Sequence, residues 1–184
     1  MIRRAVFLDR DGVINKAVVR DGRPYPPTSL RELEILDGVP QALRDLRSMG
    51  FHLIIVTNQP DVGRGYASVE DVAAIHDSLL RTLAIDDIRV CFHGGDEGCD
   101  CRKPRPGMLL AAARDLGLEL SASFMVGDRW RDVDAGAAAG CRTVLIDYGY
   151  DERAPLSHPD FTCGSLPQAV RWIVSQVENG DEAG

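Results

Sequence analysis

Short, nearly continuous hydrophobic runs bounded by turn residues recur along the chain. Strands that are covered on both faces carry such runs, because the side chains on either side of the sheet are buried. We therefore predict five strands, at Ile2–Leu8, Phe51–Thr57, Ile88–Phe92, Ser123–Gly127 and Arg142–Asp147.

Segments with helical periodicity lie between these runs. We predict helices over Val39–Met49 and Val69–Leu83, from Pro106 to Gly117, over Trp130–Ala139, and from Ser165 to Val177. Asp37 is expected to cap the first helix, and Ser68 with Asp71 resembles a capping box at the start of the second. The alternation of strands and helices predicts an α/β fold with a doubly wound parallel sheet.

The length and charge of the chain limit its class and partners. Its 184 residues fit one domain, which we expect over residues 1–178 with a polar tail over 179–184. Lys and Arg total 21 against 28 Asp and Glu, a net charge of -7, and the sequence has no basic run, so a nucleic-acid partner is not expected. No stretch is long and apolar enough to span a bilayer, so we expect a cytoplasmic protein with no membrane partner. We also expect a monomer.

Two carboxylates, Asp9 and Asp11, follow the first hydrophobic run, and Gly12 then turns the chain. Open α/β sheets bind ligands at the carboxyl ends of their strands. If the segment is still extended, the two side chains share a face and suit one hard cation such as Mg²⁺. Asp9 is then the candidate nucleophile toward phosphorus, and Asp11 the candidate general acid and base. A solvated Asp-Gly turn is the competing interpretation of this segment alone.

The interval from Gly12 to Asp37 sustains neither the helical nor the strand period, and it contains Pro24, Pro26 and Pro27. A loop of this length in a compact domain is usually functional or disordered. Its position directly after the acidic pair favours a flap or a rim around a substrate.

Polar residues also follow the other predicted strands. Thr57 ends the second run, where a hydroxyl and backbone N–H groups suit phosphate oxygens. Lys103 precedes a predicted helix and would offset the charge of a phosphoryl group in transfer, although a surface lysine is the alternative. Asp128 closes the fourth run and is the stronger candidate metal ligand. Asp132 follows four residues later and either supports that loop or interacts with the helix dipole.

The pattern C-x-H-x5-C-x-C occurs at Cys91, His93, Cys99 and Cys101. Three thiolates and one imidazole suit a closed tetrahedral Zn²⁺ site, in which the metal has a structural role. Because Cys101 is bonded directly to Arg102, such a site would hold the neighbouring Lys103 in place. Free thiols or a bond between Cys99 and Cys101 are the alternative.

Four segments together, D-R-D-G-V-I-N, T-N-Q, R-K-P and G-D-x-x-x-D, resemble motifs I to IV of the haloacid dehalogenase phosphatases. The resemblance implies a Rossmann-like sheet and a magnesium-dependent phosphatase that works through an aspartyl-phosphate intermediate. No long insertion follows the first strand or Thr57, so we expect no cap domain and a site shaped by loops alone.

With the zinc-binding loop and C-R-K-P-x-P-G-M added, the pattern from about Arg4 to Ile146 is similar to the D-glycero-D-manno-heptose-1,7-bisphosphate 7-phosphatases. That similarity implies a small phosphorylated sugar as substrate and loss of its 7-phosphate. It further implies Mg²⁺ at Asp9, the Asp11 backbone carbonyl and Asp128, and substrate contacts from Asn58, Arg102, Arg129 and, on the flap, Tyr25.

Several alternatives remain at this level. The related histidinol-phosphate phosphatases act on a cationic substrate, which would require carboxylates near the mouth of the pocket. A phosphoacceptor switch of the response-regulator type is also doubly wound, with acids at its strand ends. A zinc-stabilised binding module would leave the four motifs without a purpose. Pro60 replaces a serine that is common after T-N-Q, and Arg129 stands where lysine is common, so the exact sugar and anomer stay open.

Overall fold

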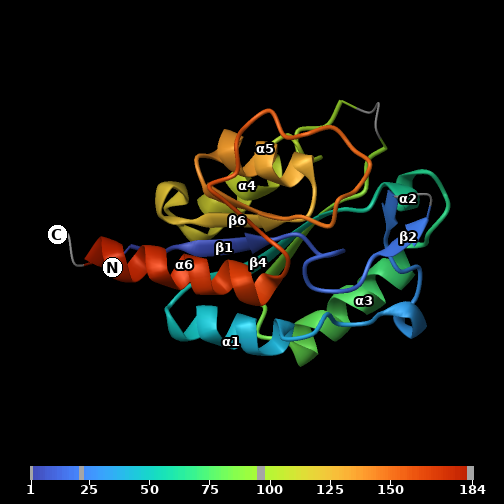
Figure 1. The fold of residues 1–184 in the computed structure, drawn as a ribbon. Coiled ribbons are helices and arrows are strands. Elements are labelled where there is room, and N and C mark those ends of the chain that lie inside the picture. Colours follow the sequence, from blue (N-terminus) through green and yellow to red (C-terminus); the bar gives the residue numbers. More distant parts are fainter. Residues whose placement is uncertain (1, 21–22, 95–97, 182–184) are drawn as a thin grey trace.

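The computed structural model describes residues 2–20, 23–94 and 98–181, which fold around one central sheet (Figure 1). Six strands are hydrogen-bonded in the order β5-β4-β1-β6-β7-β8, and every neighbouring pair is parallel. Their bounds are β1 Ala5–Leu8, β4 His52–Asn58, β5 Asp87–Cys91, β6 Phe124–Gly127, β7 Arg142–Ile146 and β8 Phe161–Cys163. The predicted fold class is confirmed. From β1 the chain first adds β4 and β5 on one side of the sheet, and afterwards adds β6, β7 and β8 on the other side. The order in which strands are added therefore reverses at β1.

Helices cover both faces of the sheet, with α4 and α5 on one side and α1 and α6 on the other (Figure 1). The long helices are α1 Val39–Ser48, α3 Val69–Thr82, α4 Gly107–Leu116, α5 Trp130–Ala139 and α6 Leu166–Asp181. Three single-turn segments complete the helical content of the described residues, namely α2 Pro60–Gly63, η1 Leu30–Glu32 and η2 Leu120–Ala122.

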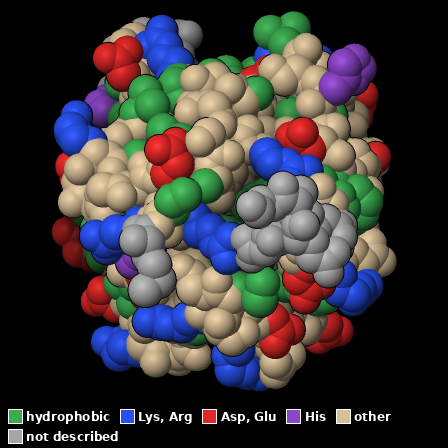
Figure 2. All heavy atoms as spheres, turned by 90° about the vertical axis from the view of Figure 1, so that its left-hand side faces the viewer, with side chains coloured by type: hydrophobic (Ala, Val, Ile, Leu, Met, Phe, Trp, Pro, Cys, Tyr) green, Lys and Arg blue, Asp and Glu red, His purple; other side chains and the backbone are tan. Residues whose placement is uncertain are grey.

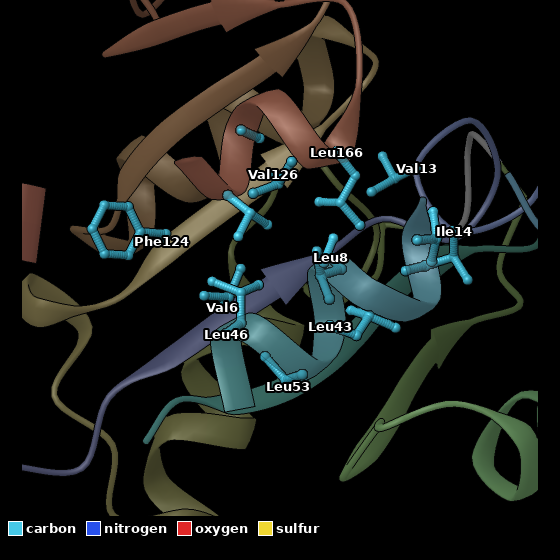
Figure 3. Packing of buried hydrophobic residues seen from close by; sticks show 14 of the residues in the cluster. Val6, Leu8, Val13, Ile14, Leu43, Leu46, Leu53, Phe124, Val126 and Leu166 are labelled. Atoms are coloured by element: carbon cyan, nitrogen blue, oxygen red, sulfur yellow. The ribbon is translucent and has the colours of Figure 1, made fainter. Parts of the chain in front are cut away.

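Side chains of β1 alternate between two hydrophobic clusters. Val6 and Leu8 pack with residues of α1 and α6 on one face (Figure 3), whereas Ala5 and Phe7 pack with residues of α4 and α5 on the other. All four are completely buried, which stabilises the fold by about 1.5–3 kcal/mol for each large side chain. This packing fixes β1 in the middle of the sheet and thereby fixes where the next residues emerge.

The helix boundaries follow the sequence prediction, with one error in capping and one in length. Ser68 caps α3 as predicted, since its Oγ accepts a hydrogen bond from the Asp71 backbone N–H at 3.0 Å. The predicted cap of α1 at Asp37 is wrong. Gly38 takes that position at φ +77, and no side chain caps the helix. Helix α6 continues to Asp181 instead of ending at Val177.

Three short strands were not predicted. Val18–Arg20 (β2) and Arg23–Tyr25 (β3) form an antiparallel pair within the long interval after Gly12, and β8 extends the main sheet. Strands of three residues are too short to show an alternating pattern, and a proline within β3 argues against a strand on sequence grounds. The pair nevertheless gives the long interval a defined shape.

The outer surface mixes charges of both signs. Figure 2 shows the end of the molecule at which β1 begins and α6 terminates, where Lys and Arg side chains are interspersed with Asp and Glu. Within the described residues, the structure has no helix that combines the length and the apolar composition needed to cross a membrane.

Candidate active site

The predicted site residues meet at the carboxyl ends of the three central strands. Asp9 follows β1 directly, and its N–H donates to the carbonyl of Val126 in β6 at 2.9 Å, which continues the pairing of the two strands. Thr57 and Asn58 end β4 on the other side of β1, and Asp128 follows β6. This is the edge at which the chain reverses direction, where ligands bind in open α/β sheets.

Lys103 joins two of these carboxylates. Its Nζ lies 2.8 Å from Asp9 Oδ1 and 2.6 Å from Asp132 Oδ1, and it donates to the Val56 carbonyl at 2.7 Å. Burial alone would lower the pKa of this lysine, but the charges of Asp132 and Asp9 raise it above its ordinary value. The side chain therefore stays protonated, as the role predicted for Lys103 requires.

Asp132 makes two contacts, one at the start of α5 and one with Lys103. Its Oδ2 accepts from the Arg129 N–H at 3.1 Å, which caps the start of α5, while its Oδ1 holds Lys103. A Cβ at position 127 would lie 2.1 Å from the Asp132 Cβ, so only glycine allows this close approach.

Three buried carboxylates form a candidate metal site. Oxygen atoms of Asp9, Asp128 and Asp132 lie within 4.8 Å of one another. Both oxygens of Asp128 are buried, and neither makes a hydrogen bond of ordinary geometry within the described residues. Burial, together with the charges of Asp9 and Asp132, raises the pKa of Asp128 well above its usual range. Burial also raises the pKa of Asp9 to about 6, against the opposing charge of Lys103.

This arrangement fits a hard divalent cation. One lysine does not neutralise three carboxylates, and Mg²⁺ with oxygen ligands removes such repulsion. Gly12 packs directly against this carboxylate cluster. Its φ is +88, and a Cβ there would lie 2.0 Å from Asp128 Oδ2. The Gly12 carbonyl accepts a hydrogen bond of 2.9 Å from the Tyr148 hydroxyl, which fixes the turn.

The Asp11 side chain lies outside this carboxylate cluster and is held by neighbouring donors. The buried Arg10 donates to both of its oxygens at 3.1 Å, Asn15 Nδ2 donates at 2.9 Å, and Gln59 Nε2 donates at 2.8 Å. Gln59 Nε2 also donates to Thr57 Oγ1 at 2.9 Å. Sequence reasoning assigned no role to Arg10, Asn15 or Gln59. They occur within the motif segments, but no periodicity identifies which side chain they orient.

A cleft of about 590 Å³ opens above these residues. Asp9, Asp11 and Lys103 lie at its base, and Tyr25 and Pro26 from the segment after Gly12 line its wall. The rest of the lining is strongly charged, with Arg64, Arg102, Arg129, Arg131 and Arg153 beside Asp61, Asp151 and Glu152. The structure thus brings Tyr25, Arg102 and Arg129, for which the resemblance implied substrate contacts, to the same cleft.

Asn58 and Arg129 are already engaged by protein groups. The Asn58 side chain is bonded to the main chain of Lys103, and the Arg129 guanidinium forms a two-point ion pair with Glu152. Glu152 comes from the loop after β7, which sequence reasoning left without a role.

The four predicted zinc ligands also converge. The Cys91 sulfur lies 3.1 Å from that of Cys101 and 3.7 Å from that of Cys99, and His93 Nδ1 lies 3.3 Å from Cys101 Sγ. No disulfide joins the cysteines, so the predicted alternative of a Cys99–Cys101 bond does not occur. One tetrahedral ion with metal–sulfur distances of about 2.3 Å would span this cluster. Arg102 Nη1 donates to the His93 carbonyl at 3.1 Å, which ties the loop to the lining of the cleft.

Comparison with known proteins agrees with this geometry. A family model described as HAD-hydrolase-like matches residues 100–169. D-glycero-D-manno-heptose-1,7-bisphosphate 7-phosphatase of Thermosynechococcus vestitus is 36% identical over 96% of this chain and 98% of its own length. The corresponding D-glycero-beta-D-manno-heptose enzyme of Escherichia coli K12 is 41% identical over 91% and 93%. The crystal structure of D,D-heptose 1,7-bisphosphate phosphatase from B. bronchiseptica, complexed with magnesium and phosphate, has a TM-score of 0.77 at 32% identity and covers 95% of this chain and 99% of its own.

Proposed function

Because the chain belongs to the haloacid dehalogenase-like phosphatases and is a relative of the heptose bisphosphate phosphatases, we propose that it removes the 7-phosphate of D-glycero-D-manno-heptose 1,7-bisphosphate. One observation carries the proposal. A buried carboxylate, Asp9, lies 2.8 Å from a buried ammonium group at the base of a cleft whose lining contains five arginines. A dianionic ester entering this cleft meets a nucleophile at the base and positive charge along the walls.

Asp9 is proposed as the nucleophile. One of its oxygens attacks phosphorus, the bond from phosphorus to the sugar oxygen breaks, and an aspartyl phosphate forms. Lys103 lies beside the attacking group and offsets the negative charge of the phosphoryl group during transfer. Thr57 is nearly fully buried at the end of β4 and is proposed to hold a phosphoryl oxygen.

Asp11 is proposed as the general acid and base. It gives a proton to the departing sugar oxygen and then takes one from the water that hydrolyses the aspartyl phosphate. Hydrogen bonds from Arg10, Asn15 and Gln59 hold its carboxylate in a fixed position at the base of the cleft.

Both metals belong to this proposal. Mg²⁺ is proposed at Asp9, Asp128 and the Asp11 backbone carbonyl, where it supplies charge neutralisation for the phosphate. Zn²⁺ is proposed at the four-residue cluster with a structural role, because protein atoms fill all four positions. Residues 1–178 are proposed to act as one catalytic domain, since the cleft draws on segments from Asp9 to Arg153.

Histidinol phosphate is the second candidate substrate. A cationic amine requires carboxylates near the mouth of the cleft, and Asp61, Asp151 and Glu152 do line it. Asp61 is paired with Arg64 and Glu152 with Arg129, however, which leaves less negative charge for an amine. The balance of charge therefore favours the sugar bisphosphate.

The test is a magnesium-dependent phosphate-release assay that compares kcat/KM on the two substrates. We expect the bisphosphate to be preferred, and no multiple turnover in Asp9→Asn with an unchanged circular dichroism spectrum. A preference for histidinol phosphate would reverse the choice of substrate. Substantial turnover by Asp9→Asn would remove Asp9 from the nucleophile role. A single stoichiometric phosphorylation of the wild-type protein, without turnover, would indicate a phosphoacceptor switch.

A further inference from the structure

Four of the five arginines that line the cleft are held by other groups of the protein. Arg64 is paired with Asp61 at 3.6 Å, Arg102 donates to the His93 carbonyl at 3.1 Å, Arg129 is paired with Glu152, and Arg153 donates to Asp134 at 3.1 Å. Each ion pair or hydrogen bond reduces the capacity of that guanidinium to bind a ligand, because the ligand must compete with the existing partner.

Arg131 differs from the other four. Within the described residues it makes no hydrogen bond and no ion pair, and its Nε is buried without a partner. Its guanidinium carbon lies 5.0 Å from the centroid of the Trp130 ring, in a cation–π contact. Because the side chain lines the cleft, an acceptor on a ligand can bind its guanidinium without displacing a protein partner.

The charges around Arg131 are suited to an anion. Burial, with the positive charge of Arg129, lowers the pKa of Arg131 to about 10, so the side chain remains charged at neutral pH. Arg102 also lies near enough to act on it electrostatically. The charges of Asp132 and Asp9 oppose the effect of these two arginines, and an anion bound beside the guanidinium adds further neutralising charge.

We propose that Arg131 is the main specificity-determining residue of the cleft and binds the phosphate group of the substrate that is not removed. The proposal rests on the proposed function, and it assigns to Arg131 the grip on the far end of the substrate that the sequence resemblance implied for Arg102 and Arg129. An arginine suits this role because its donors match two oxygens of a phosphate at once.

The geometry separates this role from the chemistry at Asp9. Lys103 contacts Asp9 directly, whereas Arg131 forms no ion pair with Asp9 although both line the cleft. The group transferred to Asp9 is thus served by Lys103, and Arg131 faces the same cleft beyond contact distance of the nucleophile.

Two substrates that differ only in the remote phosphate test the proposal, namely heptose 1,7-bisphosphate and heptose 7-phosphate. For Arg131→Gln we expect KM for the bisphosphate to rise about tenfold to a hundredfold, as for loss of a charge-assisted hydrogen bond, with KM for the 7-phosphate and both kcat values nearly unchanged. Arg131→Lys should recover part of the loss. Arg114→Gln, on the exposed face of α4, is the matched control and should behave as wild type.

Equal losses on both substrates would overturn the proposal, because Arg131 would then act on the transferred group or on the fold. Unchanged kinetics on both would overturn it as well. Titration of the bisphosphate into Asp9→Asn, with and without Arg131→Gln, separates this result from the proposed function. If binding of the bisphosphate depends on Arg131 but the wild-type protein does not hydrolyse it, the anion site is retained and the proposed activity is rejected. If the wild-type protein and Arg131→Gln hydrolyse the bisphosphate equally well, the activity is retained and the anion site is rejected.

Discussion

Asn58 and Lys103 are joined by two hydrogen bonds between a side chain and a main chain. Asn58 Oδ1 accepts from the Lys103 N–H at 3.1 Å, and Asn58 Nδ2 donates to the Lys103 carbonyl at 3.1 Å. The last residue of β4 thus fixes the backbone of the residue whose ammonium group holds Asp9. Sequence resemblance implied a substrate contact for Asn58, which lines the cleft, and its amide in addition positions the Lys103 main chain.

Replacement of Asn58 by leucine should therefore lower kcat and leave KM nearly unchanged. Without both hydrogen bonds the Lys103 backbone shifts, and small displacements of catalytic groups cost up to about a hundredfold in rate. Steady-state kinetics on the bisphosphate provide the measurement, with Asn58→Asp as the intermediate case that keeps one acceptor. A raised KM at constant kcat would instead show that Asn58 contacts the substrate.

Asp11→Asn should slow turnover by about 10²–10⁴, the usual contribution of a positioned acid and base. The change also removes the charge that neutralises the buried Arg10, so we expect a lower midpoint of thermal unfolding. Rate and unfolding must therefore be measured on the same preparation. A near-wild-type rate in a folded protein would assign proton transfer to another group.

Gly12→Ala should weaken magnesium binding more than it weakens the fold. An added Cβ would overlap Asp128 Oδ2, and Gly12 has a φ of +88 that L side chains rarely adopt. Gly50→Ala is the matched control, because its φ is +81 and nothing lies within 4 Å of the added carbon. Thermal unfolding and the magnesium dependence of activity are compared for the two variants. If Gly12→Ala and Gly50→Ala changed the magnesium dependence equally, backbone strain alone, without the overlap with Asp128, would explain the change.

Cys99→Ala should lose zinc, unfold at a lower temperature and turn over more slowly. The cluster holds the loop that carries Arg102 and Lys103, so loosening it displaces the lysine. Zinc content by atomic emission, unfolding and kcat are measured against Cys163→Ala, whose thiol lies outside the cluster. Unchanged zinc content and kinetics in Cys99→Ala would contradict the structural role.

The sequence indicated the architecture because long hydrophobic runs and capped helices are local signals. Strand β1 and the cap of α3 could be predicted from a few consecutive residues. The partners of the site residues could not, because Gln59 reaches Asp11 and Asp132 reaches Lys103 across segments distant in the sequence. The loop after β7 gave no signal, although its Glu152 neutralises Arg129. Ion pairs of this kind depend on how the loops fold over the sheet, which neither spacing nor periodicity records.

Stability of the metal-free protein should depend on pH through Asp9. Burial raises its pKa to about 6 in the folded state, above the ordinary value of 3.8, so the folded state holds this proton more tightly than the unfolded chain. The free energy of unfolding that this group contributes is therefore present below about pH 4 and is lost as pH rises through about 6. Mg²⁺ competes with the same proton, so the increase in unfolding temperature on adding Mg²⁺ should be larger near pH 8 than near pH 5.

Thermal unfolding in buffers with and without Mg²⁺ measures both effects. Removal of Mg²⁺ by dialysis is preferable to a chelator, which would also take zinc from the cysteine cluster. Asp9→Asn is the control, because its side chain does not titrate, and its unfolding temperature should fall less between about pH 4 and pH 6 than that of the wild type. A stabilisation by Mg²⁺ of the same size at both pH values would mean that no group competing with Mg²⁺ titrates between them. A difference that persists in Asp9→Asn would place the competing proton on Asp128, whose pKa is raised by burial as well.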